Sequence, residues 1–300
     1  MLKEKFKEND YIVEKYKQYI RRKISFLARI SPNKASKYLY KKMFGRKLDL
    51  KDPKTFNEKL MYLKLNEYNN NKLVINCSDK YAVREYVTDK KCGNILNKLY
   101  GVYSNANEIN WKELPQKFVL KCTHGCGFNI ICTDKEKLNK KETIKKLNKW
   151  RKKTFGYDTA ETHYTKIKPK IICERYLETD AGMLPNDYKI YCFNGEPKLV
   201  LTCTERASKL KLNFLDLNWK ELDIGTENYK SNTIPTKPNN FQEMIEYAKK
   251  LAEPFKFVRV DFYDYNGEVI FGELTFTPAG CCAQYYNDEG NKVLGNMLKI

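Results

Sequence analysis

Apolar residues recur at helical spacing through the first third of the chain. Ile12, Tyr16, Ile20, Ile24 and Leu27 form one stripe, and a period of three to four residues predicts an amphipathic helix. Capping signals predict four further helices, which begin at Ser31-Pro32 (ending at Gly45), at Thr55 to Glu58, at Ser78-Asp79-Lys80 and at Asn139 to Glu142. Apolar residues on one face predict another helix from about Phe241 that ends at Pro254. Residues 1–115 are therefore expected to be mainly helical.

From residue 118 onward, short runs rich in apolar and β-branched residues interrupt the helical spacing. These runs predict strands at residues 118–122, 129–132, 171–177, 188–193, 198–204, 257–263 and 269–276. Asn-Gly pairs at 194–195 and 266–267 separate two pairs of runs, which is a strong signal for β-hairpins. The sequence therefore predicts an α+β fold, with antiparallel sheets and flanking helices.

Composition indicates a folded protein of a reducing compartment. The 300 residues are 42% hydrophobic and 31% charged, no apolar stretch approaches the roughly 18 residues of a membrane span, and the first ten residues lack the apolar core of a secretion signal. We therefore expect a cytoplasmic protein whose ten cysteines are reduced thiols. The cysteine spacings do not suit zinc, and two histidines leave little room for His-based triads or multi-His metal sites.

The chain is strongly basic, and the excess is concentrated at its start. The formal net charge is +19, and residues 1–47 hold 15 basic and 4 acidic side chains. Arg21, Arg22, Lys23 and Arg29 lie between the apolar positions of the first predicted helix. Such a helix can lie on the anionic inner face of a membrane, meet an anionic polymer, or pack on its own protein, and the sequence does not decide among the three. No nucleic-acid-binding signature is present, so no nucleic acid is expected.

Two features of the second half fit a phosphate and metal site. Lys121 ends a predicted strand before Gly125-Cys126-Gly127, where glycines allow backbone N–H groups to approach phosphate oxygens and the lysine compensates their charge. Arg259 and Asp261 lie on one predicted strand, opposite Glu273 and Thr275 on the next, and paired carboxylates can hold divalent ions against phosphates. Each feature also occurs for purely structural reasons, as an ordinary turn or a surface salt bridge.

The turn between the last two strands decides whether these carboxylates share a face. A two-residue Asn266-Gly267 turn in a regular ladder would place Asp261 and Glu273 on opposite faces. A three-residue loop that includes Tyr265 would place them together, and we predict this longer loop. Lys189 lies on another predicted strand. The segment from Glu174 through Tyr176 and Leu177 predicts a hinge for an adenine edge, with Glu178 or Asp180 near the ribose.

Taken in order, these features resemble the ATP-grasp superfamily, and three segments resemble its TupA-like branch. The segments are DPKTFNEKL at 52–60, DYKIYCFNG at 187–195 and GELTFTP at 272–278. The branch occurs with surface-polysaccharide genes and is often labelled glycosyltransferase. The resemblance implies a basic helical extension at 1–50, a pre-ATP-grasp-like region at 51–115, a small subdomain with the Gly-rich loop at 116–180, and a large subdomain with the metal site at 181–300.

The resemblance also implies a role for each candidate residue. ATP would be bound by Lys80, Lys121, the loop Gly125, Cys126 and Gly127, the hinge Glu174, Tyr176 and Leu177, Asp180, and Lys189. Magnesium would be held by Asp261, Glu273 and Thr275, although most ATP-grasp enzymes have Asn where Thr275 stands. Arg259 and Lys189 would act in catalysis. Cys281-Cys282 stand near the expected acceptor site and leave the acceptor unspecified.

The function implied is carboxylate–amine ligation in cell-surface or capsular polysaccharide biosynthesis. An amide would form between a uronic-acid carboxylate, in a polyanionic glycan or other acceptor, and an amino acid or small amine, through an acylphosphate. Two alternatives stay open from the sequence: a glycosyltransferase that uses a nucleotide sugar, and a non-enzymatic polyanion-binding protein.

Overall fold

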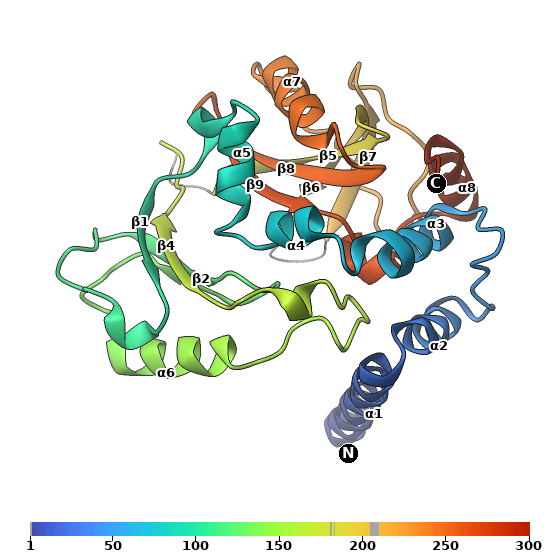
Figure 1. Ribbon diagram of the computed structural model, residues 1–300, viewed down its shortest axis with the longest axis horizontal. Coiled ribbons are helices and arrows are strands. Elements are labelled where there is room, and N and C mark those ends of the chain that lie inside the picture. Colours follow the sequence, from blue (N-terminus) through green and yellow to red (C-terminus); the bar gives the residue numbers. More distant parts are fainter. Residues whose placement is uncertain (1, 181, 183, 205–209) are drawn as a thin grey trace.

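Two antiparallel sheets organise the protein. The computed structural model describes residues 2–180, 182, 184–204 and 210–300, and Figure 1 shows both sheets. The small sheet has the order β1 (Leu99–Tyr103), β4 (Ile171–Arg175), β2 (Phe118–Cys122), β3 (Asn129–Cys132). The large sheet has the order β7 (Lys211–Asp216), β6 (Glu196–Thr204), β5 (Asn186–Phe193), β8 (Phe257–Tyr265), β9 (Glu268–Thr275). The expected α+β class with antiparallel sheets is confirmed.

Helices flank both sheets, and several begin where the sequence predicts. They are α1 (Leu2–Ile30), α2 (Pro32–Phe44), α3 (Phe56–Leu63), α4 (Lys72–Ser78), α5 (Val83–Asp89), α6 (Lys140–Arg151), α7 (Phe241–Ala252) and α8 (Asp288–Met297), with a π-helical segment η1 (Lys64–Tyr68) and short 3₁₀ segments η2 (Gly93–Ile95), η3 (Ala106–Glu108), η4 (Tyr164–Lys166) and η5 (Pro278–Cys281). Ser31 caps α2 and a left-handed Gly45 ends it, and Thr55 and Glu58 form the predicted capping box of α3. These local signals are confirmed.

Each sheet has its own apolar core. α7 packs across β5, β6 and β8. Phe56 of α3 packs against Phe193 with tilted rings and edge-on against Phe257, in the core of the large sheet. α6 packs on β2 and contributes Leu147 to the core of the small sheet. These helices thus cover the apolar faces of the two sheets and stabilise the strands that carry the candidate site residues.

Four of the strands and α-helices were not predicted from the sequence, and one predicted helix starts later than expected. The strands β1 and β7 and the helices α4 and α8 were not predicted. The helix expected from Ser78 begins at Val83, because the Asp79 carboxylate accepts from the backbone N–H groups of Tyr81 and Ala82 and holds residues 79–82 in a turn. β1 comes from the region expected to precede the small subdomain, yet it pairs with β4 in the small sheet. The domain boundaries stay a prediction.

The turn between β8 and β9 has two residues, so the predicted three-residue loop is wrong. Tyr265 pairs with Glu268 across the turn, and the two residues between them have positive φ, 52° at Asn266 and 87° at Gly267. This is the two-residue hairpin geometry that Asn-Gly favours. A regular ladder from this turn would separate the two carboxylates.

A β-bulge brings the carboxylates back together. Phe262 pairs with Phe271, but the next residue, Asp261, pairs with Glu273. Gly272 is therefore an extra residue of β9, and an extra residue reverses the alternation of side chains beyond it. Asp261 and Glu273 thus lie on one face, as the sequence led us to expect. They lie directly opposite each other, whereas the predicted loop would have paired Arg259 with Glu273 and placed Asp261 diagonally alongside.

The bulge predicts that Gly272→Ala destabilises the protein. A Cβ on Gly272 would lie 2.9 Å from the backbone oxygen of Asp261 and 3.3 Å from a ring carbon of Tyr263. Because overpacking of this kind costs about 1–3 kcal/mol, urea unfolding should show a loss of that size. In the control Gly93→Ala, the new Cβ meets nothing nearer than 3.4 Å, so its effect should be small. Equal stability of the two variants would contradict the bulge.

Candidate active site

A two-part cavity lies between the sheets. Its polar part has a volume of about 260 Å³ and its apolar part about 270 Å³. Lys121, Asn129, Glu174, Tyr263 and Gly272 line both parts, so the two form one continuous hollow. Strands β2, β3 and β4 of the small sheet and β5, β8 and β9 of the large sheet contribute to its walls.

The apolar part suits a flat ring system. Its apolar lining residues are Val119, Ile131, Tyr176, Leu177, Leu184, Pro185 and Phe271, and Asn97 and Arg175 also line it. The hinge residues Tyr176 and Leu177 follow β4 directly, so their backbone groups have no ladder partner on that strand. Apolar walls with a few polar groups at one edge are typical of a pocket that binds a nucleobase.

Lys121 is held by an ion pair from the neighbouring strand. Its Nζ lies 2.7 Å from Oε2 of Glu174, and the other oxygen of Glu174 lies 3.3 Å from Nη1 of Arg84. Burial lowers the pKa of the Lys121 ammonium, but Glu174 outweighs burial, and the pKa is raised overall. The lysine is therefore a fixed positive charge at the junction of the polar and apolar parts.

A second lysine enters the polar part from the other side. Nζ of Lys80 donates to the carbonyl oxygen of Gly125 at 2.9 Å and lies 3.8 Å from Oε2 of Glu273. The loop between β2 and β3 places Cys126 and Gly127 at the cavity wall, and Gly127 has φ of +75°. Gly125 itself lies under Phe155, since a Cβ there would come within 2.6 Å of the ring.

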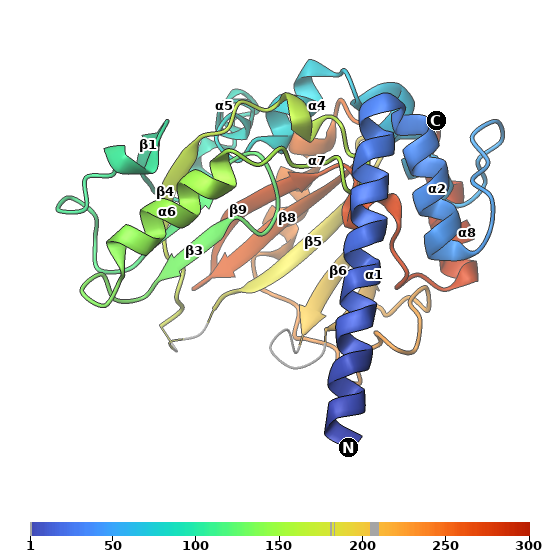
Figure 2. The same cartoon turned by 90° about the horizontal axis from the view of Figure 1, so that it is seen from below.

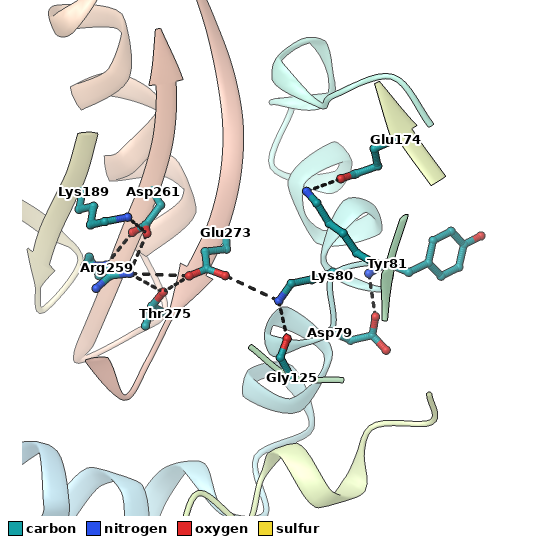
Figure 3. A network of polar contacts seen from close by, with 11 residues as sticks. Asp79, Lys80, Tyr81, Gly125, Glu174, Lys189, Arg259, Asp261, Glu273 and Thr275 are labelled. Atoms are coloured by element: carbon teal, nitrogen blue, oxygen red, sulfur yellow. Dashed lines mark hydrogen bonds and ion pairs between the residues drawn. The ribbon is translucent and has the colours of Figure 1, made fainter. Parts of the chain in front are cut away.

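Asp261 is the most heavily paired carboxylate of the cavity. Nε and Nη2 of Arg259 donate to its two oxygens, each at 2.7 Å, and Nζ of Lys189 donates to Oδ2 at 2.7 Å (Figure 3). Lys189 also lies 2.7 Å from Oδ2 of Asp187. Burial raises the pKa of Asp261, but Arg259 and Lys189 together outweigh burial, so the pKa is lowered overall.

Glu273 is the more accessible carboxylate. Its side chain is 45% exposed, against 7% for Asp261. The hydroxyl of Thr275 donates to Oε1 of Glu273 at 3.1 Å, and Nη2 of Arg259 lies 3.7 Å from the same oxygen. Figure 3 shows Asp261, Glu273 and Thr275 on neighbouring strands, with Lys80 reaching Glu273 from the opposite wall.

The donor set fits a hard divalent cation. Two carboxylates and a neutral hydroxyl are oxygen ligands of the kind that magnesium prefers, and Asp261 and Glu273 line the polar part together. Within the described residues, no group of three or more His, Cys, Asp or Glu side chains is arranged to hold a metal alone. A cation bound here would therefore need further oxygens from a phosphate chain or from water.

The structure gathers most, but not all, of the predicted site residues. Lys80, Lys121, Cys126, Gly127, Glu174, Lys189, Asp261 and Glu273 line the polar part, and Tyr176 and Leu177 line the apolar part. Gly125, Arg259, Thr275 and Asp180 line neither part. The backbone N–H and carboxylate of Asp180 instead bond the side chain of Asn266 at the hairpin tip. Glu178 forms an ion pair with Lys117. The roles of all these residues stay predictions.

Several residues of the site were missed, and three of them are charged or aromatic groups close to the predicted ones. Asp187 and Tyr263 line the polar part, and Arg84 holds Glu174. Asp187 had a usable signal, because it lies two residues before Lys189 and so shares its face of a strand. Arg84 had none, because it is 90 residues from Glu174 in the chain.

The two cysteines near the expected acceptor region are buried thiols. Cys281 and Cys282 are almost fully buried, and burial raises the pKa of Cys282 to about 12. A thiol becomes nucleophilic as its thiolate, so neither cysteine is available as a nucleophile at neutral pH.

Two antiparallel sheets that enclose lysines, carboxylates and an apolar ring pocket define a nucleotide-binding protein of the ATP-grasp type. The model of the family described as TupA-like ATPgrasp matches residues 58–299, and the chain belongs to this family. Its membership confirms the resemblance to the TupA-like branch and the expected ATP-grasp fold. No curated protein matches the chain.

Solved structures with a similar fold include several ligases. D-alanine–D-alanine ligase from Bacillus anthracis is 14% identical over 68% of this chain and 59% of its own, with a TM-score of 0.44. N5-carboxyaminoimidazole synthetase from Staphylococcus aureus, complexed with ADP, is 13% identical over 66% and 43%, with a TM-score of 0.38. Phosphoribosylamine–glycine ligase from Thermotoga maritima is 14% identical over 71% and 52%, with a TM-score of 0.40. The chain thus spans less than two thirds of the length of each.

Among the helices of the described residues, none combines the length and the apolar character that a membrane crossing requires.

Proposed function

We propose that this protein is an ATP- and magnesium-dependent carboxylate–amine ligase. The observation that carries the proposal is the continuous cavity between the two sheets, with an apolar ring pocket at one end and Lys80, Lys121 and Lys189 facing Asp261 and Glu273 at the other. Adenine fits the first part and a triphosphate the second. Membership of the ATP-grasp family supports ATP as the nucleotide.

The proposed reaction has two steps. An oxygen of the acceptor carboxylate attacks the γ-phosphorus of ATP, the bond to the β-phosphate oxygen breaks, and ADP leaves an acylphosphate behind. An amine then attacks the acyl carbon, the C–O bond to phosphate breaks, a C–N bond forms, and the amine loses a proton. The second step releases phosphate.

The predicted phosphate and metal residues each have a role in this scheme. Lys121 and Lys80 neutralise the phosphates from two sides, and the loop with Cys126 and Gly127 covers them. Arg259 and Lys189 stabilise the negative charge that builds on the transferring group. Asp261, Glu273 and Thr275 would hold magnesium, which would supply Lewis-acid stabilisation of the phosphate charge.

We propose cell-surface or capsular polysaccharide biosynthesis as the setting, in the cytoplasm. The support is the resemblance of three segments to the TupA-like branch, together with the net charge of +19, which suits a polyanionic acceptor. The acceptor class would be a uronic-acid carboxylate of a polyanionic glycan, and the amine an amino acid or other small amine. We expect no nucleic acid partner.

Lys121→Ala tests the nucleotide site directly. Charged hydrogen bonds contribute about 1.5–3 kcal/mol, so calorimetry with ATP and magnesium should show binding about tenfold weaker or worse. The matched control is Lys198→Ala, an exposed lysine on β6 that lines neither part of the cavity.

The substrates are tested by measuring ADP release with amino acids and uronic-acid acceptors. Release that needs both partners would support ligation. A uridine nucleotide bound in preference to ATP would instead indicate a glycosyltransferase. Steeply salt-dependent polyanion binding without any nucleotide binding would indicate a non-enzymatic protein.

A further inference from the structure

A row of large apolar side chains lies exposed along α1. Ile12, Tyr16, Tyr19, Phe26 and Ile30 are each more than half exposed to solvent. At 3.6 residues per turn, their positions fall on one side of the helix over 18 residues. Exposed Lys23 lies on the same side, between Tyr19 and Phe26, so the row is apolar apart from one basic side chain. A soluble protein rarely exposes so many large apolar side chains on one face without a binding partner.

This row is separate from the face that packs on the protein. Ile24 and Ala28, which are buried, lie on a different side of the helix in the core shared with α2. Figure 2 shows the N-terminal half of α1 extending well beyond the sheets. The packing of α1 on its own protein therefore explains Ile24 and Ala28, and Lys42 of α2 contacts Tyr16. Neither contact explains why Ile12, Tyr19, Phe26 and Ile30 are exposed.

Positive charges border the row. Lys15, Arg22 and Arg29 recur every seven residues along one edge, and Nζ of Lys42 in α2 donates to the hydroxyl of Tyr16 at the other. Residues 12–30 hold six basic side chains and one acidic one. Apolar residues bordered by Lys and Arg are the pattern of helices that lie in the interface of an anionic membrane.

We propose that this face of α1 docks on the surface of an anionic lipid bilayer. Phe26 and the two isoleucines enter the acyl boundary, the two tyrosines remain at headgroup depth, and Arg22 and its neighbours contact lipid phosphates. A second copy of the chain fits less well, because two such faces would bring like charges together. The proposal does not depend on the proposed ligase activity, since none of these residues lines the cavity.

Flotation of the full chain with vesicles tests the docking face. Vesicles of phosphatidylcholine alone are compared with vesicles of equal parts phosphatidylcholine and phosphatidylglycerol. We expect binding only to the anionic vesicles, and loss of at least about tenfold in the bound-to-free ratio for the triple variant Ile12→Ser, Tyr19→Ser and Phe26→Ser. Unchanged thermal unfolding shows that the variant is folded.

Neighbouring arginines provide a matched pair of variants. Arg22→Gln removes a charge beside the apolar row, whereas Arg21→Gln removes the same charge from the opposite side of the helix; both residues are exposed. Arg22→Gln should weaken vesicle binding more. Equal effects of the two variants, no binding to anionic vesicles, or binding that the triple variant leaves unchanged would overturn the proposal. Self-association in solution that the triple variant abolishes would also overturn it, in favour of a second copy.

Discussion

Glu273→Gln is expected to lower the rate of ATP turnover about 100-fold or more while the protein stays folded. Glu273 is half-exposed in the polar part of the cavity, opposite Asp261. The amide keeps the shape of the side chain and its acceptor for Thr275, but removes the negative charge that a cation beside the phosphates requires. Loss of a single group that stabilises transferring charge typically costs two to three orders of magnitude in rate.

Turnover is measured as ADP release, and cation-dependent ATP binding by calorimetry. The matched control is Glu268→Gln at the exposed start of the same strand, which should behave as the unmodified protein. Because Glu273 is accessible, an inactive variant should unfold at the same urea concentration as the parent. Full turnover by a folded Glu273→Gln protein would remove the carboxylate pair from the mechanism.

The carboxylate pair also shows how far the sequence alone leads. Alternation along a strand places Arg259 with Asp261 and Glu273 with Thr275, and both pairings hold in the structure. Alternation does not predict the bulge at Gly272. The only sequence feature that accompanies this extra residue is the glycine itself, and strand glycines also occur at bends and close backbone contacts. The expected facing of the carboxylates was right, and the turn expected to produce it was wrong.

Other parts of the site depend on contacts between distant segments. The resemblance and the local pattern placed Lys121 and Glu174 on separate strands, but their ion pair and the support from Arg84 need the β2–β4 pairing and the position of α5. β1 and β7, the edge strands that were not predicted, also depend on pairing with segments of the chain outside themselves. β1 is a half-buried edge strand, and its residues gain a partner only when β4 folds beside them.

Asp261→Asn is expected to destabilise the protein by about 3–5 kcal/mol, the cost of leaving buried charges without their partner. Arg259 and Lys189 both bond Asp261, and all three are largely buried. Urea unfolding at neutral pH measures the loss. The control Asp223→Asn removes a carboxylate that is 81% exposed and 3.8 Å from Lys230, where a change within about 0.5 kcal/mol is expected.

The same carboxylate predicts a direction for the pH dependence. An unfolded aspartate has a pKa of about 3.9, and the pKa of folded Asp261 is lowered. Its contribution is therefore complete above about pH 4 and is lost as the pH falls through the folded pKa, because only the unfolded state takes up a proton in between. The free energy of unfolding should fall less steeply with acid in Asp261→Asn than in the parent.

A second substitution separates the charge effect from simple loss of packing. In Asp261→Asn combined with Lys189→Met, one of the two uncompensated cations is gone, so part of the lost stability should return. If the double variant is less stable than Asp261→Asn, the lysine contributes more through its contact with Asp187 than it costs as an unpaired charge. A partial return of stability would instead mean that Asp261 holds the Lys189 and Arg259 side chains in place in the free protein, before any phosphate binds. When ATP and magnesium bind, they would replace these contacts of Asp261. Because the contacts already exist in the free protein, Arg259 and Lys189 would be directed toward the transferring group before it arrives.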